Sequence, residues 1–257
     1  MPVPENLLKK RLAAGEVVYG AWLGMGAAYA AEMAATAGFD WLLIDGEHAP
    51  NDVRSLSAQM AVVLPSASSA VVRPVNDDPA LIKQLLDIGA QTLLVPMVDT
   101  ADQARRIVAA TRYAPQGMRG VGASLARASK FGQVSDYIAT ANAQICLILQ
   151  VESRAGLAAL DEMLMIDGVD GLFIGPSDLA ADMGHPGNAA HPEARAAVFD
   201  ALTRIRAAGK TAGVLATDAA FIRDCVAAGA NFVGVGIDVL LYVTAMRDLA
   251  ASYKGQA

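Results

Sequence analysis

Four segments of the sequence repeat one local pattern, in which a glycine follows a helical stretch and an apolar run comes next: AGFDWLLID, IGAQTLLVP, DGVDGLFIG and AGANFVGVG. A glycine just beyond a helix adopts the left-handed conformation that commonly ends a helix. Each segment therefore predicts a helix followed by a buried strand. Repetition of this unit along the chain indicates a parallel sheet, because parallel strands need helical crossovers.

The whole chain divides into alternating strands and helices. The predicted strands are Val17–Leu23, Trp41–Asp45, Ala70–Pro74, Thr92–Met97, Ile145–Val151, Gly171–Ile174, Gly213–Leu215 and Phe232–Gly236. The predicted helices include Ala27–Ala37, Pro79–Ile88, Ala101–Thr111, Leu157–Met165, Pro192–Ala208 and Ala219–Ala228. Eight such units in 257 residues predict an α/β fold, a (β/α)8 TIM barrel that forms one domain over residues 1–257.

A doubly wound open sheet is the alternative that this alternation permits. Its dinucleotide-binding form carries a G-x-G-x-x-G motif after the first strand. This chain has YGAWLGMG there, with a different spacing, so the dinucleotide interpretation is weak.

Two segments depart from a simple barrel. The connection Ala114–Ala143 is long, contains PQGMRGVG and a predicted short helix at Val134–Ala141, and is of a kind that usually serves a site or an interface. The final helix, Val239–Ala251, is apolar around much of its circumference. A helix on a barrel exterior needs only one apolar stripe, so we expect this helix to pack against another subunit.

Composition narrows the classes of partner. The net charge of −6 argues against nucleic-acid binding, which would need a basic patch. The sequence contains no run of 18 apolar residues, so we expect no membrane span. Cys146 and Cys225 lie in apolar surroundings without metal or redox spacing, which indicates buried thiols in a reducing cytoplasm.

Polar side chains gather where the predicted strands end. The stretch ICLILQVES places Gln150 and Glu152 on one face of a buried strand, because successive side chains alternate faces. The second strand ends in Asp45, followed by Glu47 and His48, and the third ends in Arg73. In barrel enzymes the chemistry gathers at the carboxyl ends of the strands.

Glu152 and Asp178 follow adjacent strands and form a natural pair for a divalent cation, because carboxylates, waters and an oxygen-rich substrate suit Mg²⁺ or Mn²⁺. The alternative is that Asp178 and Ser153 cap the helices that follow them. The spacing alone leaves both interpretations open.

His48 is a candidate acid or base, since its ordinary pKa suits proton transfer near neutrality. His185 and His191 lie in the loop MGHPGNAAHPE, where exposure or helix capping is the expected role. Arg73 could bind a substrate carboxylate through its planar fork, or could form an ion pair with Asp45 or Glu47.

The segment Gly175-Pro176-Ser177 precedes Asp178 and could present backbone N–H groups to an anionic oxygen, although Pro176 has none to offer. No lysine ends a predicted strand, so a Schiff-base mechanism is disfavoured. If this barrel handles a carbanion next to a carbonyl, a metal has to stabilise the enolate.

The motifs IDGEHAP, VRP, PQGMRGVG, LQVES and FIGPSDLAADMG together resemble the HpcH/HpaI family of metal-dependent pyruvate aldolases, over essentially the whole chain. The resemblance implies class II aldol cleavage of 4-hydroxy-2-oxo acids to pyruvate or hydroxypyruvate and an aldehyde, with Mg²⁺, Mn²⁺ or Co²⁺ as cofactor. It also implies a cytoplasmic homohexamer whose last helix is swapped between subunits, and a role in the catabolism of aromatic compounds.

The resemblance also assigns expected roles to residues. By this transfer Glu152 and Asp178 bind the metal, His48 is the general base, and Arg73 stabilises the enolate. Gln150 and the backbone of Ser177, with Gly175 and Pro176 beside it, contact pyruvate. Trp22 and Leu215 are expected to wall the aldehyde pocket. Asp45 is a catalytic candidate because it shares a loop with His48.

Asp87 matches the acidic partner that raises the basicity of the family's histidine. It ends a helix at the opposite face of its own barrel, so either a neighbouring subunit or a bent path of the chain would be needed to bring it to His48. Three rival functions stay open at this point. They are a CoA-thioester lyase of the same superfamily, a metal-free phosphosugar isomerase with VGVGID as its anion loop, and a non-catalytic binding barrel.

Overall fold

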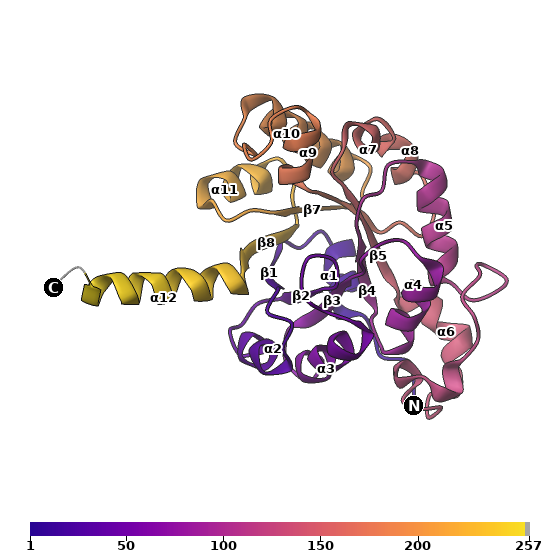
Figure 1. Ribbon diagram of the computed structural model, residues 1–257. Helices are drawn as coiled ribbons and strands as arrows, with labels where there is room; N and C mark the ends of the chain where they lie inside the picture. Colours follow the sequence, from indigo (N-terminus) through magenta and orange to yellow (C-terminus); the bar gives the residue numbers. More distant parts are fainter. Residues whose placement is uncertain (255–257) are drawn as a thin grey trace.

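The computed structural model describes residues 1–254 and contains a closed barrel of parallel strands in the order β1 to β8 (Figure 1). The strands are β1 Val18–Leu23, β2 Trp41–Asp45, β3 Ser69–Arg73, β4 Thr92–Val95, β5 Cys146–Val151, β6 Gly171–Ile174, β7 Thr211–Leu215 and β8 Phe232–Ile237. Pairing of β1 with β8 closes the barrel, and this confirms the predicted (β/α)8 fold over the open sheet.

The helices surround the barrel. They are α1 Leu7–Ala13, α2 Ala28–Ala35, α3 Val53–Val63, α4 Pro79–Asp87, α5 Ala101–Thr111, α6 Tyr137–Gln144, α7 Arg154–Ala158, α8 Leu160–Leu164, α9 Pro176–Asp182, α10 Pro192–Ala207, α11 Ala219–Ala227 and α12 Asp238–Lys254. Two short 3₁₀ helices, η1 Ala123–Leu125 and η2 Arg127–Ser129, lie in the long connection after α5. In the described part of the chain, no helix is both long and apolar enough to cross a membrane.

The alternation of side chains along β5 follows the predicted pattern. Cys146 and Ile148 join the cluster inside the barrel, whereas Leu147 and Leu149 pack into the layer between strands and helices. Gln150 therefore extends the interior row, and it reaches the rim at the carboxyl end of the barrel. The barrel interior and the functional rim are parts of one continuous column of side chains.

Aromatic rings fill the barrel interior. Trp41 stacks on Phe232 with ring centroids 4.1 Å apart, and Phe173 lies 6.1 Å from Phe232 in an edge-to-face arrangement. Trp41 fits because β1 has a glycine beside it: a Cβ at Gly20 would approach the indole ring to 2.1 Å. A bulkier residue at this position would force the indole out of the barrel.

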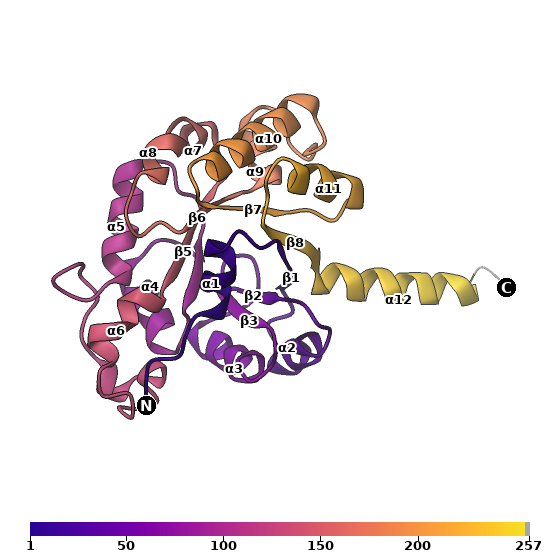
Figure 2. The ribbon, with the colours of Figure 1, turned by 180° about the vertical axis from the view of Figure 1, so that it is seen from behind.

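Helix α1 closes the amino-terminal end of the barrel (Figure 2). Leu8 and Leu12 join the interior cluster. The side chain of Asn6 caps the helix by accepting the Lys9 N–H, and it donates to Thr92 Oγ1 at 3.0 Å. This closure leaves the carboxyl end as the open end.

Several predicted boundaries were wrong by a few residues, and each has a local cause. The fourth strand ends at Val95 rather than Met97, because Met97 takes a left-handed conformation (φ 56°) and its N–H donates to Glu152. The helix predicted at Leu157–Met165 is two short helices, the first of which begins at Arg154 because the Ser153 side chain accepts the Gly156 N–H. The short helix predicted at Val134–Ala141 lies at Tyr137–Gln144.

Helix α12 extends away from the barrel and contacts it through its first turns beside β1 and β8 (Figures 1 and 2). None of its described residues is buried, and three large apolar side chains, Leu240, Leu241 and Leu249, are each more than half exposed. An exposed apolar surface of this kind marks an interaction site. The exchange of this helix between subunits stays a prediction.

The two cysteines are free and buried, as predicted. Burial raises the pKa of the Cys225 thiol to about 12, and burial also raises the pKa of Cys146. A raised pKa lowers the thiolate fraction, and the thiolate is the reactive form.

We therefore expect neither thiol to react with a disulfide reagent in the native protein at about pH 8, where a pKa of about 12 leaves about one thiolate in ten thousand. Absorbance of the released chromophore measures the reaction. Unfolding in guanidinium should release both thiols quickly. Rapid reaction of a native thiol would contradict the burial described here.

Candidate active site

A cavity of about 410 Å³ opens at the carboxyl ends of the strands. Its lining contains every predicted site residue except Glu152 and Asp87. The lining residues are Trp22, Gly24, Asp45, His48, Arg73, Gln150, Phe173, Gly175, Pro176, Ser177, Asp178, Leu215, Ile237, Val239 and Leu240. Residues far apart in the sequence meet here because parallel strands end at the same rim.

Arg73 is buried at this rim and is held by two carboxylates. Its Nε and Nη2 donate to the two oxygens of Asp45 at 2.8 and 2.6 Å, and its Nη1 forms an ion pair with Glu47 at 2.7 Å. Asp45 and Arg73 are directly paired residues of β2 and β3, so strand register sets this bidentate contact. Both ion pairs considered from the sequence are thus present, and they fix the guanidinium in place.

The β2–α3 loop is fixed around Asp45. The Asp45 Oδ1 accepts the Glu47 N–H at 3.0 Å, and its carbonyl accepts the Asn51 side-chain amide at 2.7 Å. Gly46 N–H donates to the carbonyl of Arg73 at 2.8 Å. Asp45 thus binds Arg73 and its own loop, and no hydrogen bond or ion pair joins it to His48 in the described residues.

Glu152 lies at the end of β5 with 4% of its surface exposed. One carboxylate oxygen accepts the Met97 N–H at 2.9 Å, and the other accepts the Gln150 side-chain amide at 2.5 Å. No arginine, lysine or histidine of the described chain forms an ion pair with it. Burial raises the pKa of Glu152, and the charges of Asp178 and Glu47 raise it further.

The neighbouring carboxylates also affect the pKa of Glu47. Burial raises its pKa, and the neighbouring charges of Asp45 and Asp178 add to that increase, although Arg73 and His48 act in the opposite direction. Glu47, Glu152 and Asp178 therefore lie close enough to influence one another. Glu47 follows the second strand, but nothing in its spacing along the chain distinguishes it from an ordinary ion-pair partner of Arg73.

The residues at the rim fit a divalent cation. Glu152 is a buried carboxylate without a cationic partner, and oxygen ligands of this kind suit Mg²⁺ and Mn²⁺. Gly175 leaves room beside it, since a Cβ there would approach the Glu152 oxygen to 2.6 Å. The Gln150 amide oxygen is also buried without a partner, which is expected where a bound group completes the hydrogen bonding.

Asp178 lies in the first turn of α9 and not at its cap position. The cap residue is Gly175, which makes no side-chain cap bond, and Pro176 is the first helical residue. The capping alternative for Asp178 is therefore wrong, whereas Ser153 does cap α7. The Asp178 carboxylate is exposed at the cavity, where it is available to a ligand.

His48 is exposed at the cavity, with 71% of its side chain accessible to solvent. Its Nε2 lies 3.7 Å from a carboxylate oxygen of Glu47. Its acidic neighbour is thus Glu47, and the arrangement allows an imidazole to exchange protons with a ligand in the cavity.

An apolar wall completes the cavity. Trp22 and Leu215 line it as predicted, and Trp22 lies 5.7 Å below the Arg73 guanidinium carbon. The sequence analysis missed Val239 and Leu240, the second and third residues of α12. Their position directly after the last strand was the available signal.

A single side chain holds this wall together. Asp238 accepts the backbone N–H groups of Gly24 at 2.7 Å and of Met25 at 3.3 Å. It thereby ties the β1–α2 loop to the start of α12, which places Gly24 and Val239 side by side at the cavity.

Asp87 lies outside the cavity of its own barrel. It ends α4 at the amino-terminal end of the strands, where it forms an ion pair with Arg119 at 2.7 Å. Arg119 in turn lies over the ring of Tyr113 at 4.4 Å. A role for Asp87 beside His48 still requires a second subunit, and it stays a prediction.

Larger hollows lie elsewhere, one of about 490 Å³ beside η2 and one of about 640 Å³ beside α6. Neither lies at the carboxyl ends of the strands, and neither contains a buried carboxylate pair. The strand-end cavity is therefore the better candidate in the described structure, despite its smaller volume.

A family model described as HpcH/HpaI aldolase/citrate lyase matches residues 19–245. The chain belongs to this family. It is 57% identical over 254 residues to a protein of Roseovarius nubinhibens named hydroxypyruvate/pyruvate aldolase, with 99% of each chain covered. It is 55% identical to the 2-keto-3-deoxy-L-rhamnonate aldolase of Escherichia coli O157:H7, over 97% of this chain and 93% of that protein.

Solved structures agree with the HpcH/HpaI assignment. A family member from Burkholderia cenocepacia matches with a TM-score of 0.92 and 41% identity, covering 97% of this chain and 99% of that one. These similarities confirm the family resemblance drawn from the motifs. They also confirm the expectation that the chain is an aldolase-type carbon–carbon lyase.

The charge balance of the rim leads to a prediction that does not depend on activity. Replacing Glu152 by Gln removes a buried charge that lacks a cationic partner, so the metal-free variant should melt several degrees higher than the metal-free wild type. Mg²⁺ should raise the Tm of the wild type and leave that of Glu152→Gln almost unchanged. Calorimetry in chelator and in excess Mg²⁺ measures both.

Glu162→Gln on α8 is the matched control, because that carboxylate is exposed and remote from the rim. It should behave as wild type. An equal Mg²⁺ response in wild type and Glu152→Gln would show that Glu152 does not bind the ion.

Proposed function

We propose that the chain is a metal-dependent aldolase that cleaves 4-hydroxy-2-oxo acids to pyruvate or hydroxypyruvate and an aldehyde, and that also catalyses the reverse addition. The observation that carries this proposal is the buried Glu152 carboxylate without a cationic partner, beside Asp178 and near the fixed guanidinium of Arg73. The relatives support the substrate class, since their names combine a 2-oxo acid with aldolase activity.

Glu152 and Asp178 are the proposed ligands of the cation, which we expect to be Mg²⁺, Mn²⁺ or Co²⁺. When bound, such a cation withdraws charge from the keto oxygen of the substrate and so acidifies the neighbouring carbon. The protein's contribution is to supply oxygen ligands in a partly closed cavity and to leave positions open for the substrate.

Arg73 is proposed to stabilise negative charge on the substrate enolate. Its three contacts with Asp45 and Glu47 leave part of the guanidinium's N–H donors unused, and the residue lines the cavity. Because the guanidinium is already held in place, it needs little reorganisation when charge develops. Asp45 then acts as a positioning residue rather than as a group that touches substrate.

His48 is proposed to move the proton at Nε2 between cavity and solvent. It takes the proton from the substrate hydroxyl during cleavage and returns one in the reverse direction. Glu47, 3.7 Å from Nε2, is the acidic residue beside this imidazole within the same chain. Asp87 of a neighbouring subunit is the second proposed acidic partner.

The remaining lining residues are proposed to position the two parts of the substrate. Gln150 and the backbone N–H of Ser177, with Gly175 and Pro176 shaping the turn, bind the 2-oxo acid. Trp22 and Leu215 bound the space for the aldehyde. A panel of aldehydes offered with pyruvate and with hydroxypyruvate tests this division, with product formed only when a divalent cation is present.

The assembly and cellular setting are further parts of the proposal. An exposed apolar α12 supports a homohexamer with that helix exchanged between subunits. We also propose that the enzyme acts in the cytoplasm. A role in the catabolism of aromatic compounds stays a prediction from the resemblance alone.

Replacing Arg73 by Lys tests the chemical role of the guanidinium. A point charge cannot bridge Asp45 and Glu47 and also reach the substrate, so kcat should fall by about two orders of magnitude, the scale of losing one oxyanion donor. Exchange of the methyl protons of pyruvate with deuterated solvent, followed by proton NMR, isolates this step from aldehyde binding.

The variant should also lose stability, because the buried Asp45 and the partly buried Glu47 lose part of their shared partner. Exchange is therefore measured well below its Tm, with Arg105→Lys on α5 as the matched exposed control. Wild-type exchange in folded, metal-saturated Arg73→Lys would make Arg73 a binding residue only.

Assembly can be tested on the exposed part of α12. Replacing Met246 and Leu249 by Lys puts charge on a surface that we expect another subunit to cover, and burial of those charges would oppose association. Light scattering should then show a smaller assembly, with the far-UV circular dichroism of the barrel unchanged. An unaltered mass would argue against α12 as the contact.

A further inference from the structure

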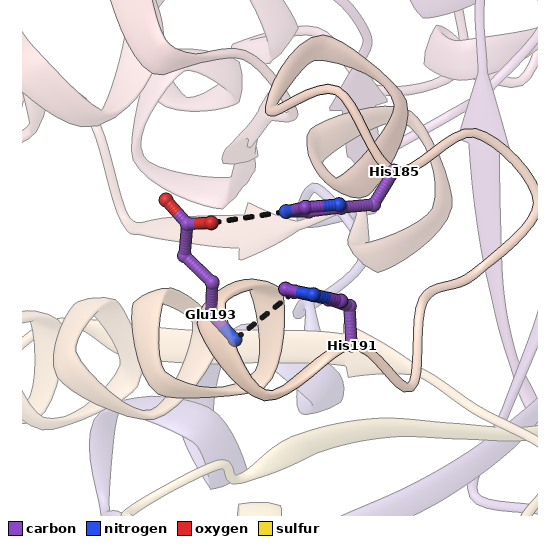
Figure 3. A group of neighbouring side chains, drawn as sticks. All are labelled: His185, His191 and Glu193. Carbon is purple, nitrogen blue, oxygen red and sulfur yellow. Dashed lines mark hydrogen bonds and ion pairs between the residues drawn. The ribbon is translucent and has the colours of Figure 1, made fainter.

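Two imidazoles and one carboxylate form a cluster on the loop between α9 and α10, where the proposed function uses none of them. The cluster consists of His185, His191 and Glu193 (Figure 3). One ligand atom from each residue lies within 4.8 Å of those from the other two. None of the three lines the strand-end cavity.

The two imidazole rings stack with their centroids 3.4 Å apart and their planes 18° from parallel. The stack keeps the ring nitrogens of the two side chains close to each other. His191 Nδ1 accepts the Glu193 N–H at 3.3 Å, so its lone pair already serves the helix cap, and an ion has to displace this bond or bind the other ring nitrogen. Neutral imidazole is the form that binds metal ions.

The third donor is an ionised carboxylate. His185 Nε2 lies 2.9 Å from a Glu193 carboxylate oxygen, and this hydrogen bond is the main reason why the pKa of Glu193 lies below its ordinary value. An imidazole nitrogen and a carboxylate oxygen thus already face each other at hydrogen-bonding distance. A metal ion can replace a proton in such a position, because it binds the same two lone pairs.

The loop holds the two histidines close together before any ion arrives. The Asn188 N–H donates to the His185 carbonyl at 3.1 Å, and the His191 N–H donates to the Asn188 carbonyl at 3.0 Å. Proline follows each histidine, at Pro186 and Pro192, and restricts the backbone on both sides. Little conformational entropy is left to lose on binding.

Helix capping explains only part of this arrangement. His191 is the cap residue of α10, and its bond to Glu193 satisfies a free N–H of the first turn. Capping does not require the His185 ring to stack on His191 or to bond the Glu193 carboxylate. The nearest competing cation, Arg154, is already paired with Asp182.

We propose that one ring nitrogen of His185, one ring nitrogen of His191 and a Glu193 carboxylate oxygen bind a late first-row transition metal ion, for which Zn²⁺ is the probe. Two imidazoles and a carboxylate favour such ions over Mg²⁺, which prefers oxygen ligands alone. Ligand distances of about 2.0–2.2 Å require the three side chains to move closer together. The two rings also have to turn out of their parallel stack, because an imidazole lone pair lies in the plane of its ring. Water completes the shell, because the cluster is at the surface.

This site differs from the proposed carboxylate site in the ion that it selects and in what it connects. It joins the loop after α9 to the first turn of α10. Helix α9 begins at Pro176 and carries Ser177 and Asp178 at the cavity. A bound ion therefore stabilises the segment that supports one side of the cavity, without touching a ligand in it.

Counting bound ions tests the proposal. The full-length protein is dialysed against low Zn²⁺ in a large excess of Mg²⁺, so that Mg²⁺ competes for the all-oxygen cavity site, and bound zinc is measured by mass spectrometry. The wild type should retain one Zn²⁺ per chain more than His185→Ala/His191→Ala. Equal zinc in the two proteins would overturn the proposal.

Glu193→Gln gives a second measurement that keeps both imidazoles. It should weaken Zn²⁺ binding by about tenfold, since one anionic ligand is lost, whereas the exposed control Glu162→Gln should bind as wild type. Unchanged affinity in Glu193→Gln would remove the carboxylate from the site. If the double histidine variant does not fold, Glu193→Gln and His185→Asn carry the comparison.

Cu²⁺ provides a spectroscopic signature of the ligands. The electron paramagnetic resonance spectrum of the Cu²⁺-loaded, Mg²⁺-saturated wild type should show hyperfine coupling to two nitrogens, and His185→Asn should reduce it to one. A spectrum that the substitution leaves unchanged would place the ion elsewhere. These measurements do not depend on aldolase activity, so their results test the metal site separately from the proposed function.

Discussion

Charge balance at the carboxyl end of the barrel governs the arrangement of the site. Asp45, Glu47, Glu152 and Asp178 gather there, and Arg73 is the buried cation among them. Buried charges are costly unless they are paired, so the surplus of carboxylates favours either protonation or a bound cation. The raised pKa values of Glu47 and Glu152 express the same surplus.

Much of the fold could be predicted from local sequence. The glycine-and-strand repeat predicted the βα units, and the alternation in ICLILQVES placed Gln150 and Glu152 on the interior face. Strand-end positions then identified Asp45 and Arg73, because barrel topology makes such residues neighbours wherever they lie in the chain. These features depend on periodicity, which a single sequence displays.

Other features depend on tertiary contacts that periodicity does not encode. Strand β4 ends at Val95, before Met97, whose N–H donates to Glu152, the residue that directly follows β5. Val239 and Leu240 belong to a helix, yet the direction in which that helix leaves β8 brings them to the cavity. The two roles considered for Arg73, as an ion-pair partner and as a substrate-binding residue, are compatible, because the ion pairs leave some of its N–H donors free.

The two ends of helix α12 lie in different environments. Its first residues line the cavity, where Asp238 fastens them to the loop after β1, and the rest of its length points away from the barrel with its apolar side chains exposed. A helix is stiff along its axis, so both ends move as one body. A substitution that changes the direction of α12 at its outer end therefore also changes the positions of Val239 and Leu240 at the cavity. The shape of the cavity and the contacts of the exposed surface are therefore coupled through this helix.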